Sequence, residues 1–299
     1  MELDTILAAL EENSTQKFPY EAISQAIARK EEITPLLLTA LEDTKANLKE
    51  IAQKPSYFLH IYALFLLAQF RETSAYPLIV DLFSVPGDIV YDITGDILTE
   101  DLGRILASVY DGNLSLIKGL IEDLDVFESV RTAGLTALET LVAQNVLSRE
   151  SVLDYFKHLF SILPNDEDYE FSSMLVISCI DLCPDEELLT IIRSVFKKDL
   201  IDEMLVVMEE VEEAFEVGPE KALADLREQR HYRFVEDAIA EMEWWACFQE
   251  NKPRQVRSAP LGLYWDLEPD RNKKQKAKRK KKRKMQKQAR KQNRAKKKK

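Results

Sequence analysis

The run from Val130 to Leu141 constrains the fold of this chain more than any other stretch, and it reads V-R-T-A-G-L-T-A-L-E-T-L. Its apolar residues recur at helical spacing, so the run predicts an α-helix with one face turned to a core. The small residues Ala133 and Ala137 allow a second helix to approach closely. Because such a helix pair buries its other face only by stacking on the next pair, the run predicts further pairs along the chain.

The same run resembles the second helix of a HEAT repeat, whose usual pattern is V-R-x-A-A-x-x-A-L-x-x-L. Gly134 departs from that pattern at the second alanine. The segment Ala63-Leu64-x-x-Leu67 repeats Ala137-Leu138-x-x-Leu141 at a separation of 137 − 63 = 74 residues, or two units of 37. This spacing is just under the roughly 40 to 47 residues typical of HEAT repeats. We therefore expect an all-α, HEAT-like α-solenoid of stacked helix pairs over residues 1–250.

Several helix boundaries follow from local signals. Thr34-Pro35 predicts a helix start, with Thr34 as N-cap and Pro35 at the first helical position. The apolar spacing from Ile97 to Leu106 predicts a single helix, the second of its pair. A last helix is expected from about Phe234 to Phe248. The adjacent Trp244 and Trp245 point about 100° apart on a helix and are not expected to fill one pocket.

Composition favours a soluble, mostly helical protein, since 45% of the 299 residues are hydrophobic and only 8 are glycine. No basic region precedes an apolar run at the N-terminus, so we expect no signal peptide. The most apolar run, Tyr57 to Phe70, is shorter than the roughly twenty residues that a bilayer requires, and we expect no membrane span. Three cysteines provide no disulfide framework.

Charge is divided unequally along the chain. The net charge of −11 conceals a segment, Arg271 to Lys299, with 19 Lys or Arg residues and no acid. Residues 1–270 therefore hold 41 − 19 = 22 basic and 52 acidic residues, a net charge of −30. The cations of this basic tail are Arg271, Lys273, Lys274, Lys276, Lys278, Arg279, Lys280, Lys281, Lys282, Arg283, Lys284, Lys287, Arg290, Lys291, Arg294, Lys296, Lys297, Lys298 and Lys299.

The basic tail, residues 271–299, is expected to be disordered when unbound, because its cations are interleaved only with Gln, Asn, Ala and one Met and cannot build a core. Three uses are consistent with it: binding to RNA or DNA, recognition by a nuclear import receptor in a eukaryotic cell, and docking on the chain's own acidic body. It lacks aromatic residues for base stacking, so any nucleic-acid binding should show little sequence preference.

Residues 251–270 differ from both neighbouring parts. The segment Ser258 to Asp270 has no helical period but carries apolar and aromatic residues. We expect an extended apolar arm packed on the body; a linear motif for another protein is the alternative.

No catalytic signature is present. Phosphate-binding, dinucleotide-binding, zinc-protease and serine-hydrolase motifs are absent from the sequence, and His60, His158 and His231 lie in separate elements. Asp92, Asp96 and Glu100 would share one helical face, which could bind a cation or a basic partner but is also typical of a solvated face. We expect a non-enzyme with no cofactor, metal or small-molecule substrate.

Several segments of the sequence also resemble a bacterial family of uncharacterised helical-repeat proteins. The resemblance covers roughly residues 1 to 255 and includes I-T-P-L-L-L from Ile33, A-L-F-L-L-A-Q-F-R-E-T from Ala63 and D-L-x-R-I-L-A-S-V-Y-D-G from Asp101. It implies a helical fold and cytoplasmic residence, and it assigns no functional residues. Family members often end in a SEC-C zinc motif, but here no cysteine follows Cys247, so zinc binding is not implied.

These features favour a scaffold that presents a helical face to a partner protein and is tethered by its basic tail to nucleic acid or ribosomes. The alternative is a tail used for targeting or self-docking, on a solenoid with an unrecognised enzymatic or chaperone role.

Overall fold

The structure is a computed structural model that describes residues 1–14, 17–162 and 169–249. These residues form α-helices and two short 3₁₀-helices, and the described ranges hold no β-strand beyond isolated bridges such as Glu12 with Tyr57. The prediction of an all-α solenoid of stacked helix pairs is confirmed. The predicted arm (251–270) and basic tail (271–299) lie outside the described residues, and the compact unit within residues 1–250 is described by itself.

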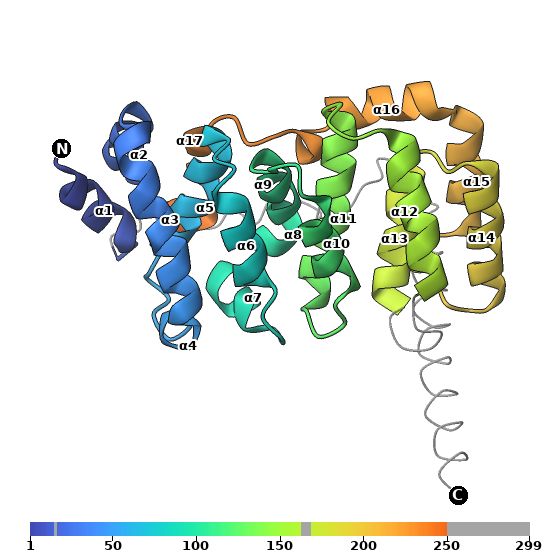
Figure 1. Ribbon diagram of the computed structural model, residues 1–299, viewed down its shortest axis with the longest axis horizontal. Coiled ribbons are helices and arrows are strands. Elements are labelled where there is room, and N and C mark those ends of the chain that lie inside the picture. The colour runs from blue at the N-terminus through green and yellow to red at the C-terminus, as the bar shows by residue number, and fades with distance from the viewer. Residues whose placement is uncertain (15–16, 163–168, 250–299) are drawn as a thin grey trace, which may run out of the picture. The chain divides into compact units, whose positions relative to one another are not determined.

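Five helix pairs form the body of this unit (Figure 1). Within each pair the first and second helices contact each other, and nearly every helix packs on its counterpart in the next pair. The apolar residues that recur at helical spacing lie in these contacts and form one continuous core. The pairs are α3 (Lys30–Ala46) with α5 (Leu59–Phe70), α6 (Ala75–Phe83) with α9 (Leu102–Ser108), α10 (Leu114–Glu122) with α11 (Glu128–Ala143), α12 (Arg149–Ile162) with α13 (Tyr169–Asp181), and α14 (Glu186–Lys197) with α15 (Met208–Val217). The exception among the counterparts is α10 with α12, which meet through the Tyr155 OH, a donor to Glu122 Oε1 at 2.9 Å.

Shorter helices complete the first two pairs. α1 (Leu3–Glu11) and α2 (Tyr20–Ala28) precede α3, and α1 also contacts α5. α4 (Leu48–Ile51) lies between α3 and α5, whereas α7 (Ile89–Thr94) and α8 (Ile97–Glu100) lie between α6 and α9. α4 contacts α7, so these short helices meet beside the stack.

After α15 the chain reverses and runs back over the second helices (Figure 1). This return segment, residues 219–249, consists of α16 (Pro219–Glu228), η1 (Arg230–Tyr232), α17 (Ala238–Met242) and η2 (Ala246–Phe248). α16 contacts α15, α13 and α11, and α17 contacts α5. The return segment therefore meets the second helices in the reverse of their chain order.

Hydrogen bonds hold the return segment against the second helices at successive points along its length. The Gln144 Nε2 donates to the Tyr232 carbonyl at 3.0 Å, the Val235 amide donates to Ser108 Oγ at 2.9 Å, and the Ala238 amide donates to Gln69 Oε1 at 2.8 Å. Because these tertiary bonds replace a helical ladder, the chain between η1 and α17 is not helical. The predicted single helix from Phe234 to Phe248 is therefore wrong, and α17 begins only at Ala238.

Two other predicted boundaries differ. Thr34-Pro35 does not start a helix, because α3 begins at Lys30 and Pro35 lies inside it, with Thr34 Oγ1 donating to the Lys30 carbonyl at 2.7 Å. The predicted helix through Ile97 and Leu106 is divided at Asp101 into α8 and α9. Before it, Gly95 has φ 56° and ψ −134°, a conformation that ends α7 and that L-residues rarely adopt.

Small residues set the spacing of α11 against its neighbours. A Cβ built on Gly134 would lie 2.5 Å from Ile121 Cγ1, so the departure from the HEAT pattern brings α10 close to α11. A Cβ built on Gly103 of α9 would lie 2.9 Å from the Ala133 carbonyl oxygen and 2.7 Å from Thr136 Cβ. Backbone therefore approaches backbone at this point, as the small-residue pattern predicts.

The buried Arg104 joins α9 to the return segment. Its side chain is 1% exposed, and its Nε donates to the Arg233 carbonyl at 2.7 Å. Nη1 donates to Asp101 at 3.0 Å, and Nη2 donates to Glu241 at 2.6 Å. Burial lowers the pKa of Arg104, and Asp101 opposes this effect. Arg230 pairs with Glu241 as well, so two cations meet two carboxylates in one network.

A second buried group of acids lies under the return segment. Tyr232 OH donates to Asp181 Oδ2 at 2.6 Å, and burial raises the pKa of Asp181. Burial, together with the charge of Asp181, raises the pKa of Glu139, whose Oε1 has no hydrogen-bond partner among the described residues. A hydrogen bond with Ser178 opposes this shift, but burial dominates, so Glu139 holds a proton at pH values where an exposed glutamate has lost it.

We expect Gly103→Ala to lower the midpoint of thermal unfolding, because its Cβ would press on the Ala133 carbonyl and Thr136, which belong to a packed helix. Gly119→Ala is the matched control: its Cβ meets nothing within 4 Å and it lies in α10, so this variant should gain up to about 1 kcal/mol. Equal effects of the two substitutions would contradict the close approach of α9 and α11.

Arg104→Met should destabilise the fold by about 3 to 5 kcal/mol, because it leaves the Asp101 and Glu241 carboxylates buried with Arg230 as their remaining cationic partner. Hydrogen exchange should show faster exchange at the Val235 and Ala238 amides. Arg104→Met/Glu241→Leu should recover part of the lost stability. A double variant no more stable than the single one would show that the buried charges are not the cause.

Glu139→Gln should change the pH dependence of stability. Because the pKa of Glu139 is raised in the folded chain, its neutral carboxyl contributes its full stability below the ordinary glutamate pKa. This contribution is lost as pH rises toward the raised pKa. The variant's melting midpoint should therefore rise relative to the parent between about pH 5 and about pH 8.5. Glu213→Gln, at an exposed position of α15, should show no such change. A midpoint difference independent of pH would contradict a protonated Glu139.

Candidate functional site

The sequence indicated two candidate sites, the basic tail and a group of three acids, and the structure describes only the second. The Lys and Arg residues from Arg271 to Lys299 lie outside the described residues, so their binding to nucleic acid stays a prediction. The acids Asp92, Asp96 and Glu100 are described, but they do not share one helical face, because Gly95 separates α7 from α8. They nevertheless line one cleft.

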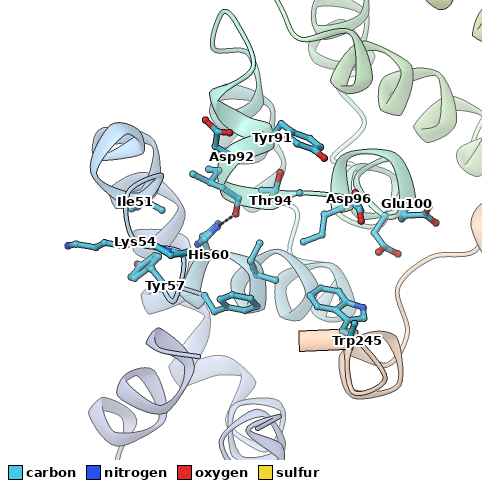
Figure 2. A pocket seen from close by; sticks show the side chains of 18 of the residues that line it. Ile51, Lys54, Tyr57, His60, Tyr91, Asp92, Thr94, Asp96, Glu100 and Trp245 are labelled. Atoms are coloured by element: carbon cyan, nitrogen blue, oxygen red, sulfur yellow. Dashed lines mark hydrogen bonds between the residues drawn. The ribbon is translucent and has the colours of Figure 1, made fainter. Parts of the chain in front are cut away.

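This cleft has a volume of about 660 Å³ and is lined by residues from three stretches of the chain, 51–61, 91–101 and 230–246. We call it the α7–α8 cleft. Figure 2 shows Tyr91 and Asp92 on one side of it, Trp245 on the opposite side, and Lys54 with Tyr57 at a third edge. Because the return segment supplies one wall, the cleft depends on the docking that Arg104 secures.

His60 holds the end of α7 against α5. Its Nε2 donates to the Ile93 carbonyl at 2.7 Å, and its ring stacks on Tyr57 with centroids 5.5 Å apart (Figure 2). Burial lowers the pKa of His60 to about 4, so the ring is neutral at physiological pH, with its proton on Nε2. Nδ1 has no partner among the described residues. This histidine positions backbone and has its only proton engaged.

The carboxylates of the cleft fall into two groups. Asp92, Asp96 and Glu100 are exposed, and within residues 1–14, 17–162 and 169–249 none of them forms an ion pair. Asp101 is buried and is paired with Arg104 at 3.0 Å. Burial raises the pKa of Asp101, and the charges of Arg104 and then Arg230 oppose this. The first group is therefore available to an incoming cation, whereas the second is part of the fold.

The cations of the cleft are already engaged. Lys54 pairs with Glu50 at 2.7 Å, and Arg230 pairs with Glu241. The cleft thus presents more unpaired negative than positive charge to a ligand.

Aromatic side chains form much of the remaining wall. Trp244 is 61% exposed and Tyr91 is 48% exposed, whereas Trp245 packs against Phe65 with centroids 5.5 Å apart and against Phe248 at 6.2 Å. Both tryptophans line the cleft, so the expectation that they would not share a pocket is wrong. They lie after α17, which ends at Met242, and therefore do not follow helical geometry.

No group of three or more His, Cys, Asp or Glu side chains in the described part of the chain is arranged to hold a metal ion. Cys179 and Cys183 are both buried, as expected of small core residues, and Cys247 is exposed. No helix among the described residues is long and apolar enough to cross a membrane.

The fold is an all-α solenoid that carries the α7–α8 cleft. Among known proteins, the chain belongs to the family described as "Protein of unknown function (DUF1186)", whose model matches residues 1–249. The resemblance to an uncharacterised helical family is thereby confirmed.

Two curated relatives, each described as an uncharacterized protein, are 40% identical over 229 residues. One is from Chlamydia trachomatis (serovar D), with 76% of this chain and 89% of the relative covered, and the other from Chlamydia muridarum, with 76% and 90% covered. No solved structure matches the chain significantly.

Proposed function

We propose that this chain is a non-enzymatic helical-repeat scaffold of the bacterial cytoplasm, whose body binds a partner protein and whose basic tail tethers it to RNA or DNA. The observation that carries the proposal is the separation of charge: residues 1–270 hold 22 basic and 52 acidic residues, whereas residues 271–299 hold 19 cations and no acid. Opposite charges on two parts of one chain suit two different partners.

The structure favours a particular part of the body for protein binding. The sequence suggested a helical face as the partner surface, but the return segment occupies much of the row of second helices. The α7–α8 cleft is lined instead by exposed aromatic and carboxylate side chains that no other described segment covers. Exposed aromatic residues beside a concave surface are typical of binding sites.

A role in binding is also better supported than a role in catalysis. The one histidine in the cleft, His60, is neutral and donates its proton to backbone. Its exposed carboxylates, from Asp92 to Glu100, lack a histidine, serine or cysteine partner in hydrogen-bond contact among the described residues. Activation of a serine or cysteine nucleophile needs such a contact with a base.

The reach of the tail allows both partners to bind at once. Extended, residues 271–299 span at most about 100 Å, at roughly 3.3 to 3.6 Å per residue. This length is far greater than the Debye length of about 8 Å at physiological salt. Phosphates held by the tail are therefore screened from the acidic body.

The full chain should bind duplex DNA and single-stranded RNA of several sequences with similar affinity. If the tail neutralises about eight phosphates of a duplex, the logarithm of the association constant should fall against the logarithm of salt with a slope near −7. Fluorescence anisotropy with labelled oligonucleotides measures both quantities. Deleting residues 271–299 should abolish binding and leave the thermal melt of the body nearly unchanged.

A matched control replaces the five arginines of the tail by lysine, which keeps its charge and should keep the affinity. Binding by the truncated chain, or none by the full chain at low salt, would contradict the tethering role. A self-docking or nuclear-targeting tail, on a body with an enzymatic or chaperone role, would then be the better account. Pull-downs from a bacterial lysate, with and without nuclease, separate protein partners from those retained through nucleic acid.

A further inference from the structure

The α7–α8 cleft combines two kinds of recognition surface. Its carboxylates Asp92, Asp96 and Glu100 are exposed and form no ion pair among the described residues. Beside them lie Trp244, 61% exposed, and Tyr91, 48% exposed. Large aromatic side chains attract cations through their ring faces and also bury apolar groups. The same ligand can therefore satisfy both surfaces if it carries a cation next to an apolar side chain.

The walls of the cleft are held in place before any ligand binds. Trp245 is fixed by Phe65 and Phe248, and Tyr57 is stacked on His60, which in turn binds the α7 backbone. A site whose aromatic walls are already ordered loses less conformational entropy on binding than a mobile one.

The cleft's own cations cannot neutralise the three exposed carboxylates. Lys54 pairs with Glu50 on the adjacent α4, and Arg230 pairs with the buried Glu241 and lies 3.8 Å from Asp101. Releasing Arg230 would leave carboxylates of the Arg104 network short of charge. The unpaired acids must therefore take their counterion from outside the described residues.

The volume of the cleft limits the size of the ligand that it can hold. A volume of about 660 Å³ lies within the range of roughly 300 to 1,000 Å³ of pockets that enclose a small ligand or a few side chains. A folded domain would not enter it, whereas an extended segment could place a few side chains there.

We propose that the α7–α8 cleft binds an extended segment of a partner protein in which an Arg or Lys side chain lies beside a Leu or aromatic side chain. The cation meets Asp96 and Glu100, and the apolar side chain packs between Trp244 and Trp245. This inference rests on the protein-binding part of the proposed function and assigns it a place and a ligand chemistry.

The test uses the full chain and short fluorescein-labelled peptides in which Arg or Lys alternates with Leu or Tyr. A matched set carries the uncharged Gln in place of each cation, and binding is read by fluorescence anisotropy. We expect the basic peptides to bind with a Kd in the range of about 1 to 100 μM and the uncharged set to bind at least about tenfold more weakly. Binding should weaken as salt is added.

Two variants locate the site. Asp96→Asn/Glu100→Gln should weaken binding of the basic peptides by about tenfold or more, and Trp244→Ala should weaken it by a similar factor. Both change exposed side chains, so the thermal melt should stay unchanged. The control Glu209→Gln/Glu213→Gln removes the same charge from an exposed face of α15 and should leave the affinity unchanged.

Each other outcome overturns the proposal in a recognisable way. Equal weakening by the cleft and control variants would mean diffuse attraction to an acidic body. Binding of spermidine, but of no peptide, would mean a site for a small cation. Suppose that the peptides bind neither the parent chain nor Asp96→Asn/Glu100→Gln, and that this variant binds RNA more tightly than the parent. The chain's own basic tail would then be the occupant of the cleft.

The proposed function can fail separately. If the chain binds no nucleic acid but binds the basic peptides, the tethering role fails and the cleft inference holds. If the chain retains a partner protein from a nuclease-treated lysate but binds no peptide, the cleft inference fails and the scaffold function holds.

Discussion

The guanidinium of Arg104 is the interaction on which the assembled body depends. Its Nε and two terminal nitrogens bond to the carbonyls of Arg233 and Phe234 and to the carboxylates of Asp101 and Glu241. A charge that is 1% exposed is tolerated only when its donors are satisfied in this way. The partners lie up to 137 residues away, so one side chain links the second helix pair to the end of the described chain. The return segment docks only where this network can form.

The helix stack and the return segment are stabilised by different means. Between α9, α10 and α11 the contacts are apolar and close, and Gly103 and Gly134 allow backbone to approach. The return segment has few buried apolar residues between η1 and α17 and instead donates or accepts hydrogen bonds at Tyr232, Val235 and Ala238. Dispersion and burial therefore order the stack, whereas the segment that crosses it adds directional bonds to the burial of Val235, Met242 and Phe248.

Acidic residues have three distinct environments in this chain. Asp101 and Glu241 are buried and paired with arginine, and Glu139 is buried without a cation, so burial favours its neutral form. Asp96 and Glu100 are exposed beside aromatic rings and form no ion pair among the described residues. A count of net charge cannot separate these environments, although only the last is available to a partner. The division separates the acids that belong to the fold from those that remain exposed in the cleft.

The sequence by itself determined the helical class, the pairing of helices and the close contacts of α11, because burial on one face of a helix is recorded locally at a period of 3.6 residues. Gly134 was visible as a departure from the pattern, and the structure shows Ile121 in the space that its missing Cβ leaves. Separation of charge between residues 1–270 and 271–299 was equally plain, since it depends on composition alone.

Only the tertiary structure decided the course of residues 219–249 and the existence of the α7–α8 cleft. The extended backbone near Val235 is held by Ser108 of α9, and an interaction across 127 residues has no periodic signature in the sequence. The break at Gly95 could have been inferred from glycine's preference for turns, yet the spacing of Asp92, Asp96 and Glu100 favoured one helical face across it. Trp244, Glu100 and Tyr57 face the cleft from three remote stretches, and no local pattern could place them together.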